Sequence, residues 1–310
     1  MKHVYGPVPS RRLGRSLGID LVPKKICTYD CIYCQIGRTT RQTIERKEYI
    51  PASSILRDCR KALHEGGGTV DYIACSGSGE PTLNLGIGEV IQGLKELTSI
   101  PVAVITNSSL LHHGEVRKAI IQADVVMPSL DAVTPSVFET INRPHPSLDV
   151  AQIIQGLADF RSEYAGQIWL EILLCRAVND SREEIEQLQQ AIRRIQPDKV
   201  QLNTVVRPAM EDYAAPLSLD AMEHVKASLG GDTEIIAEFK GQGETIVGAA
   251  VEQQVIHLIQ RRPVTTDDLA RILGLHHIEL TKILDKLTKE GKLSYQVFNQ
   301  RLYYKTIEKA

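Results

Sequence analysis

The sequence of 310 residues lacks a long apolar run: no stretch approaches the roughly 18 uninterrupted apolar residues of a membrane span. Residues 1–16, MKHVYGPVPSRRLGRS, also lack the apolar core of a signal peptide. Six cysteines are too few to make a disulfide scaffold in a chain of this length. These absences predict a cytoplasmic protein with no membrane segment, in a compartment where thiols stay reduced.

A fourth cysteine is missing from the most informative motif. The segment KKICTYDCIYCQIG, residues 24–37, holds Cys27, Cys31 and Cys34, whereas the other three cysteines stand alone in the sequence. A structural zinc site almost always has four protein ligands, and a ferredoxin cluster also uses four thiolates. Three thiolates on a [4Fe-4S] cube leave one iron open to a small molecule.

The spacing C-x3-C-x2-C, with Tyr33 directly before the last cysteine, resembles the signature of the radical S-adenosylmethionine (SAM) superfamily. An incomplete zinc site is the alternative. The resemblance implies that the open iron chelates the amino and carboxylate groups of SAM. An electron from the reduced cluster then cleaves SAM to methionine and a 5′-deoxyadenosyl radical, with Tyr33 near the adenine. It also implies reduced flavodoxin or ferredoxin as the electron donor.

Strand-length apolar runs alternate with helical periodicity from residue 16 to about residue 230, which is typical of a parallel sheet covered by helices. Six such units match the partial (βα)6 TIM-like barrel that the resemblance implies, in the α/β class. In such barrels the chemistry lies at the carboxyl ends of the strands, where the cysteines also fall. The expected strands are residues 16–22, 70–76, 102–106, 123–127, 168–175 and 199–206.

The turn after the second expected strand, Ser78-Gly79-Glu80-Pro81, resembles the GGEP motif of the same superfamily. A glycine-rich turn exposes backbone groups to a ligand, and a carboxylate can accept a hydrogen bond from the SAM ammonium. We therefore expect Ser78, Gly79 and Glu80 to bind SAM, against the alternative of an ordinary turn.

Polar residues follow the next two expected strands. Asn107 is expected either to bind the ligand or to cap the loop. Ser129 and Asp131 stand where superfamily members commonly bind the SAM ribose, with a helix cap as the alternative. Asn142, Arg143 and His145 form a polar cluster that is expected to contact the substrate, although Arg143 could instead form a structural salt bridge.

The fifth and sixth strands carry polar residues within apolar runs. A carboxylate at Glu171 is costly in a buried strand unless it is paired, so we expect it to face the barrel lumen. Cys175 could face the substrate or be inert packing. Asn203 is expected near the adenine, because superfamily members often use this strand there, and Arg207 is expected near the substrate.

The residues around the cysteines are strongly basic: residues 1–47 hold ten Lys/Arg and three Asp/Glu. This excess is either a solvated edge or a surface that attracts an anionic substrate or electron donor. Arg12 in this region is a further candidate to contact the substrate.

After about residue 250 the pattern changes to three short helices and a hairpin, an order that resembles a winged helix-turn-helix. We therefore predict a barrel domain over residues 1–245, holding the [4Fe-4S] cluster, and a winged-helix domain over residues 250–310. The helix with Lys282, Lys286 and Lys289 is too balanced in charge to identify a nucleic-acid surface. RNA or DNA, a protein or peptide, and packing against the barrel all remain open as its partner.

The predicted function is that of a radical SAM enzyme acting on a macromolecule, with a nucleotide in RNA as the first candidate and a protein or peptide side chain as the second. The segments YGPVPSRRLGRSLGIDLVP and GEPTL resemble the wyosine-type tRNA-modifying branch. Wyosine-forming enzymes bind a second cluster through cysteines upstream of the triplet, and no cysteine precedes Cys27, so that specific reaction is not predicted. An iron-sulfur redox sensor that binds DNA is the alternative from another class.

Overall fold

The computed structural model describes residues 2–65, 69–236, 251–275 and 277–307. Its larger part is built on an eight-stranded sheet in the order β1-β2-β5-β6-β7-β8-β9-β10. The expected partial barrel of parallel strands is confirmed, because the six middle strands pair in parallel in chain order. These strands are β2 (Gly14–Ile19), β5 (Tyr72–Cys75), β6 (Val102–Thr106), β7 (Val125–Pro128), β8 (Gln167–Leu174) and β9 (Lys199–Thr204).

The two edges of the sheet carry strands that the apolar pattern did not indicate. Strand β1 (Val4–Ser10) pairs antiparallel with β2, and β10 (Thr233–Ile235) pairs parallel with β9. The sequence VYGPVPS of β1 contains a glycine and two prolines, which are unfavourable within a sheet. Proline is tolerated on an edge strand, where one row of backbone groups has no ladder partner.

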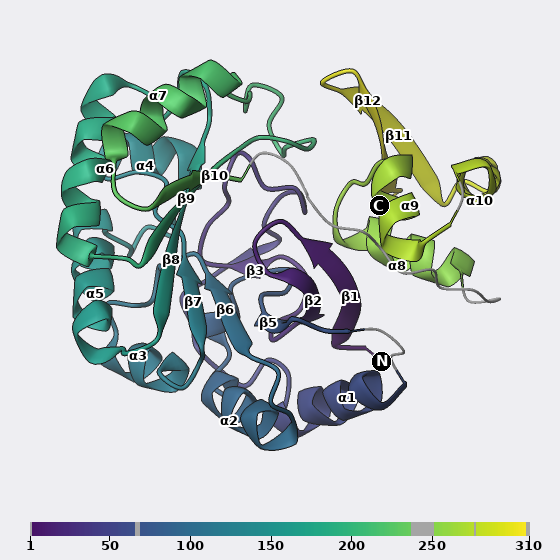
Figure 1. The fold of residues 1–310 in the computed structure, drawn as a ribbon, viewed down its shortest axis with the longest axis horizontal. Helices are drawn as coiled ribbons and strands as arrows, with labels where there is room; N and C mark the ends of the chain where they lie inside the picture. Colours follow the sequence, from purple (N-terminus) through teal and green to yellow (C-terminus); the bar gives the residue numbers. More distant parts are fainter. Residues whose placement is uncertain (1, 66–68, 237–250, 276, 308–310) are drawn as a thin grey trace.

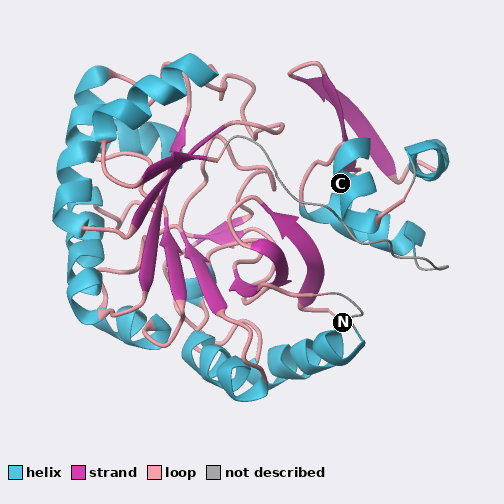
Figure 2. Cartoon of the chain, viewed as in Figure 1, coloured by secondary structure: helices cyan, strands magenta, loops and turns pink. Residues whose placement is uncertain are grey.

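Helices cover the outer face of the parallel strands, and the loops that follow the strands gather inside (Figures 1 and 2). Helix α6 shows why these segments are helical: Ser181 accepts a hydrogen bond from the Glu184 amide, with acidic residues in the first turn and arginines in the last. The helices are α1 (Ala52–Glu65), α2 (Ile87–Leu97), α3 (Gly114–Ile120), α4 (Pro135–Asn142), α5 (Val150–Glu163), α6 (Arg182–Ile195) and α7 (Leu219–Leu229).

The C-terminal part has the expected order of three helices and a hairpin, and it has its own hydrophobic core. Thr265 caps the second helix in a capping box with Asp268, and Gly274 ends that helix at a φ of 64°. The elements are α8 (Val251–Arg261), α9 (Thr266–Leu273), α10 (His277–Lys289), β11 (Leu293–Phe298) and β12 (Arg301–Thr306).

The C-terminal part rests against the barrel (Figure 1). Arg261 forms an ion pair with Asp20 at 2.7 Å, and the guanidinium lies 3.5 Å from the ring centre of Tyr5. Arg207, just beyond β9, lies 3.4 Å from the carboxylate of Asp268. Further out, the hydroxyl of Tyr303 donates to the carbonyl of Val206 at 2.9 Å. Several partly buried polar contacts therefore hold the two parts together.

Candidate active site

The three clustered cysteines lie on one loop at the centre of the barrel. The loop runs from β3 (Ile26–Cys27) to β4 (Arg41–Gln42), two short strands that pair in parallel. Cys27, Cys31 and Cys34 are half-buried, whereas Cys59, Cys75 and Cys175 are fully buried in the hydrophobic core. The thiols within reach of a ligand are therefore those of the triplet.

Each sulfur of the triplet has a polar N–H group from a different side chain beside it. The Asn107 amide lies 3.5 Å from the Cys27 sulfur, and the Asn142 amide lies 3.5 Å from the Cys31 sulfur. The Lys25 ammonium lies 3.2 Å from the Cys34 sulfur. Donors placed in this way stabilise sulfur when it carries negative charge, as in a thiolate bound to iron.

The protonation of the triplet thiols depends on their burial. Among the residues that the structure describes, no group of three or more His, Cys, Asp or Glu side chains is arranged to hold one metal ion. Burial raises the pKa of Cys27 to about 12 and raises that of Cys31 well above its usual value. These thiols are therefore protonated in the metal-free chain, and iron binding would release their protons.

The turn that contains Gly79 and Glu80 packs closely against the cysteine loop. A Cβ atom at Gly79 would lie 2.0 Å from the carbonyl oxygen of Ile26, so a side chain cannot be accommodated there. The Glu80 amide donates to this same carbonyl, and the Lys25 amide donates to the carbonyl of Ser78. Ser78 lies at the wall of the central cavity, so this turn offers backbone groups to a ligand beside the cysteines.

The carboxylate of Glu80 lies in a network of hydrogen-bond donors from the protein. Its side chain is only 2% exposed, and both carboxylate oxygens already accept hydrogen bonds from the protein. The donors are the amide and hydroxyl of Thr82, the hydroxyl of Thr106 and the amide of Asn107, at 2.6 to 3.0 Å. Glu80 therefore joins two strand ends and positions Asn107. Its direct contact with the SAM ammonium stays a prediction, since Oε2 accepts a hydrogen bond from the Asn107 amide alone.

Asp131 is similarly occupied by the protein. One oxygen accepts from the Tyr33 hydroxyl at 2.5 Å and from the Asn142 amide at 2.7 Å, and the other accepts from the Leu173 amide at 2.9 Å. Burial raises the pKa of Asp131 to about 6. Asp131 thus holds Tyr33, and half-buried Ser129 lies at the start of the same loop. The contact of both residues with the SAM ribose stays a prediction.

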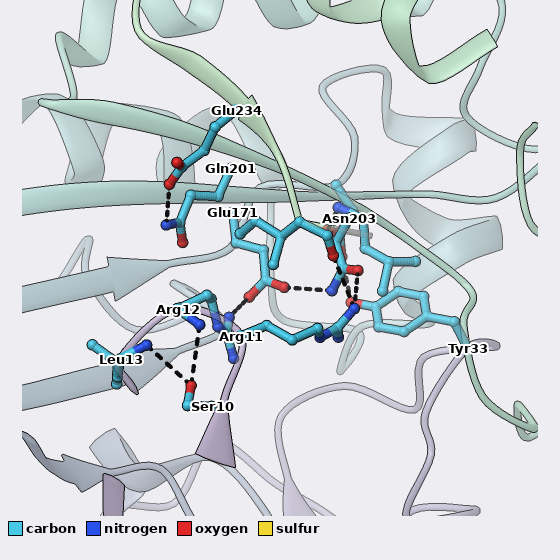
Figure 3. Close-up of polar contacts among 12 residues, drawn as sticks. Ser10, Arg11, Arg12, Leu13, Tyr33, Glu171, Gln201, Asn203 and Glu234 are labelled. Carbon is cyan, nitrogen blue, oxygen red and sulfur yellow. Dashed lines mark hydrogen bonds and ion pairs between the residues drawn. The ribbon is translucent and has the colours of Figure 1, made fainter. Parts of the chain in front are cut away.

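Glu171 faces the lumen, as its polarity within an apolar strand indicated. It forms an ion pair with Arg12 and accepts from the Asn203 amide at 2.9 Å. Arg11 in turn donates to the Asn203 side-chain carbonyl at 2.9 Å (Figure 3). The turn after β1, which carries both arginines, is thus tied to β8 and β9 through Glu171 and Asn203.

The remaining expected substrate residues divide into two groups. Arg12 and Arg207 line the central cavity. Arg143 is instead bound to the Glu211 carboxylate at 2.7 Å, which is the structural salt bridge weighed against a substrate contact. His145 lies with Arg143 in a separate outer pocket. Cys175 is 0% exposed and packs in the core, which was the alternative to a contact with the substrate.

Several residues of the site were not selected from the sequence. Lys25 directly flanks the triplet, and its charge beside thiolates was a signal available in the sequence. Asn142 was expected only as part of a polar cluster for substrate contacts, and its reach to Cys31, Tyr33 and Asp131 is not indicated by any local pattern. The cavity is also lined by residues of the C-terminal part, and these could not be placed there without its position. They are Leu258, Arg261, Arg262, Val264, Asp268, Arg271 and Ile272.

Comparison with known proteins agrees with this geometry. The family model of the radical SAM superfamily matches residues 21–189. Over 98% of its length the chain is 32% identical to "UPF0026 protein MJ1312" of Methanocaldococcus jannaschii, covering 96% of that protein. It is also 35% identical to a Brachyspira hyodysenteriae protein named "GTPase Obg", but it spans only 45% of that relative.

A solved radical SAM methyltransferase from Sphaerobacter thermophilus has a similar fold. Its TM-score is 0.54 at 16% sequence identity, over 72% of this chain and 66% of that one. The chain belongs to the radical SAM superfamily, and it is an S-adenosylmethionine-dependent enzyme of the kind that uses a [4Fe-4S] cluster. Among the described residues, no helix is long and apolar enough to cross a membrane.

Proposed function

We propose that Cys27, Cys31 and Cys34 hold the [4Fe-4S] cluster, and that the enzyme modifies a macromolecule, in the first place a nucleotide in RNA. When bound, the cluster supplies the electron that cleaves SAM to methionine and a 5′-deoxyadenosyl radical. Reduced flavodoxin or ferredoxin is the proposed source of that electron, and the basic surroundings of the cysteine loop suit an acidic donor protein.

The proposed SAM site lies between the cysteine loop and the strand ends. Tyr33 and Ser78 would meet the adenosine and methionine portions at the cavity wall, with the backbone at Gly79 close by. Asn107 and Ser129 follow β6 and β7, and Glu171 and Asn203 face the lumen from β8 and β9. We propose that Glu80 and Asp131, whose carboxylates the protein already orients, contact the SAM ammonium and the ribose in addition to positioning Asn107 and Tyr33.

The observation that carries the macromolecular substrate is the position of the C-terminal part. It lines the same cavity as Tyr33 and Cys34, so a substrate that reaches the cysteine loop also meets α8 and α9. We propose that this part is a winged-helix domain over residues 250–310, following a barrel domain over residues 1–245. The boundary between 245 and 250 lies outside the described residues.

The test is stimulation of SAM cleavage by substrate. The anaerobically reconstituted enzyme, with SAM and dithionite, should release more 5′-deoxyadenosine when cellular RNA is added, and digestion of that RNA should yield a nucleoside of altered mass. The control is the same RNA treated with ribonuclease beforehand. Stimulation by a peptide fraction and not by RNA would favour modification of a protein side chain instead.

The likeness to the wyosine-type branch is part of this proposal. It rests on the sequence around Arg11 and Arg12 and on the GEPTL segment, and it favours tRNA as the first RNA to test. A redox-sensing regulator is separated from an enzyme by the same assay, since a sensor would release no 5′-deoxyadenosine in the presence of SAM and reductant.

A further inference from the structure

The cavity between the barrel and the C-terminal part is unusually rich in arginine. It has a volume of about 420 Å³ and borders the cysteine loop at Tyr33 and Cys34. Its charged lining residues include no lysine, and the acidic ones are Glu171 and Asp268. Against these two carboxylates stand six guanidinium groups, those of Arg11, Arg12, Arg207, Arg261, Arg262 and Arg271.

The carboxylates do not satisfy all of these cations. Glu171 pairs with Arg12, and the carboxylate of Asp268 is shared between Arg207 and Arg271 at 3.4 and 3.5 Å. Arg261 pairs at 2.7 Å with Asp20, which is not among the residues that line the cavity. The Nε atoms of Arg207 and Arg261 are buried without a hydrogen-bond partner. Within the described part of the chain, no hydrogen bond or ion pair engages Arg262.

The pKa values of two arginines agree with an excess of positive charge in the cavity. Burial, together with the positive charge of nearby Arg207, lowers the pKa of Arg262 to about 9 and that of Arg11 to about 10. Burying like charges beside one another costs folding free energy unless a ligand compensates them. Such a cost is commonly retained where a protein binds a ligand of the opposite charge.

We propose that this cavity binds a phosphate group of the substrate, and that the C-terminal domain supplies half of the arginines that hold it. The proposal deepens the proposed function and rests on it. Guanidinium groups present a planar fork of donors that matches phosphate oxygens, whereas lysine acts as a point charge. A lining of several arginines and no lysine therefore fits phosphate recognition by direct hydrogen bonds.

This assignment changes the role of the C-terminal domain. Arg261, Arg262 and Arg271 reach the cavity from α8, from the turn after it and from α9. A phosphate held among them would lie beside the loop that bears Tyr33 and Cys34. The domain would then form one wall of the substrate site rather than a separate docking module.

Arg262→Gln in the full-length, cluster-reconstituted protein tests the proposal. The probe is a short uridine oligoribonucleotide labelled with fluorescein, and inorganic pyrophosphate is its competitor. Both are measured at saturating SAM, so that the SAM carboxylate occupies its own site and does not compete with the probes for the arginines. We expect the affinity for both probes to fall about tenfold, or about 1.4 kcal/mol. The slope of log affinity for the RNA against log salt should fall by about 1.

Two comparisons separate ligand binding from a structural role. The exposed Arg60→Gln variant on α1 should bind both probes like the wild type. The melting temperature of Arg262→Gln should equal or exceed that of the wild type, because the change removes an uncompensated charge. If Arg262→Gln does not fold, Arg262→Lys replaces it, and it should bind more weakly than the wild type because it keeps the charge but loses the fork.

The outcomes distinguish this proposal from the proposed function. RNA binding that is unchanged in the Arg262 variants overturns the phosphate site, while an RNA substrate survives. Pyrophosphate binding that depends on Arg262, without binding of RNA, supports the phosphate site and removes RNA in favour of a small phosphorylated substrate. A glutamate peptide that binds the cavity more tightly than both phosphate probes would overturn the phosphate assignment and indicate an acidic peptide.

Discussion

Replacing Glu80 by alanine should destabilise the protein as well as weaken SAM binding. The side chain is 2% exposed and its carboxylate accepts four hydrogen bonds, two of them from the backbone amides of Thr82 and Asn107. A change to alanine leaves these buried amides without an acceptor, at about 1–3 kcal/mol each. The hydroxyls of Thr82 and Thr106 can rotate toward other acceptors and so add less.

Part of this loss is offset because the buried charge itself is unfavourable. Burial raises the pKa of Glu80 despite its four donors, so removing the carboxylate recovers some desolvation free energy. We therefore expect a net loss of about 2–4 kcal/mol. At about 2–4 °C per kcal/mol for a domain of this size, the melting temperature should fall by roughly 5–15 °C.

The assay pairs thermal unfolding of the metal-free protein with SAM titration of the reconstituted protein. Exposed Glu139→Ala on α4 is the matched control and should change neither quantity. Glu80→Gln keeps the shape and one acceptor oxygen, so it should fall between alanine and the wild type. Weakened SAM binding in Glu80→Ala with an unchanged melting temperature would contradict the expected loss of stability and leave Glu80 with a role in SAM binding alone.

Three further predictions follow from the site and from the C-terminal part. Cys27→Ala, Cys31→Ala or Cys34→Ala should each abolish SAM cleavage, and iron analysis should find about four irons per chain, whereas about eight would refute a single cluster. Burial raises the pKa of Asp131 to about 6, so its contribution to the free energy of unfolding is present at low pH and is lost as pH rises through about 6. Asp131→Asn should flatten this fall in stability, measured by urea unfolding of the metal-free protein at several pH values. A pH profile unchanged by Asp131→Asn would refute this role. If α10 also contacts RNA, a combined Lys282→Gln, Lys286→Gln and Lys289→Gln variant should lower the salt slope of RNA affinity, whereas an unaltered slope would exclude these exposed lysines from the contact.

The fold could be predicted from the sequence because its signals are local. The parallel strands coincide with short segments that are apolar or alternate between apolar and polar residues, and the cysteine triplet is a contiguous motif. Strand β1 was missed because glycine and proline are unfavourable in strands, although an edge position tolerates them. Strand β10 has only three residues, Thr233–Ile235, too few for a periodic pattern.

The roles of individual side chains were harder to predict because they depend on distant partners. The sequence shows a carboxylate after Gly79, but not that Thr82 and Thr106 lie on either side of it. Cys175 ends an apolar strand, and only the packing decides that its sulfur points into the core. The arginine cavity joins residues near the start of the chain to residues about 250 positions later, so it exists only in the folded molecule.

Arg11 lies between the substrate cavity and the two edge strands of the partial barrel, β1 and β10. The sheet ends at β1 on one side and β10 on the other, and Arg11, in the turn after β1, donates to the carbonyl of Ile236 just after β10 at 3.0 Å. Its guanidinium also holds Asn203, which in turn holds Glu171. Arg11, which itself lines the cavity, therefore links the wall of the substrate site to both edges of the sheet.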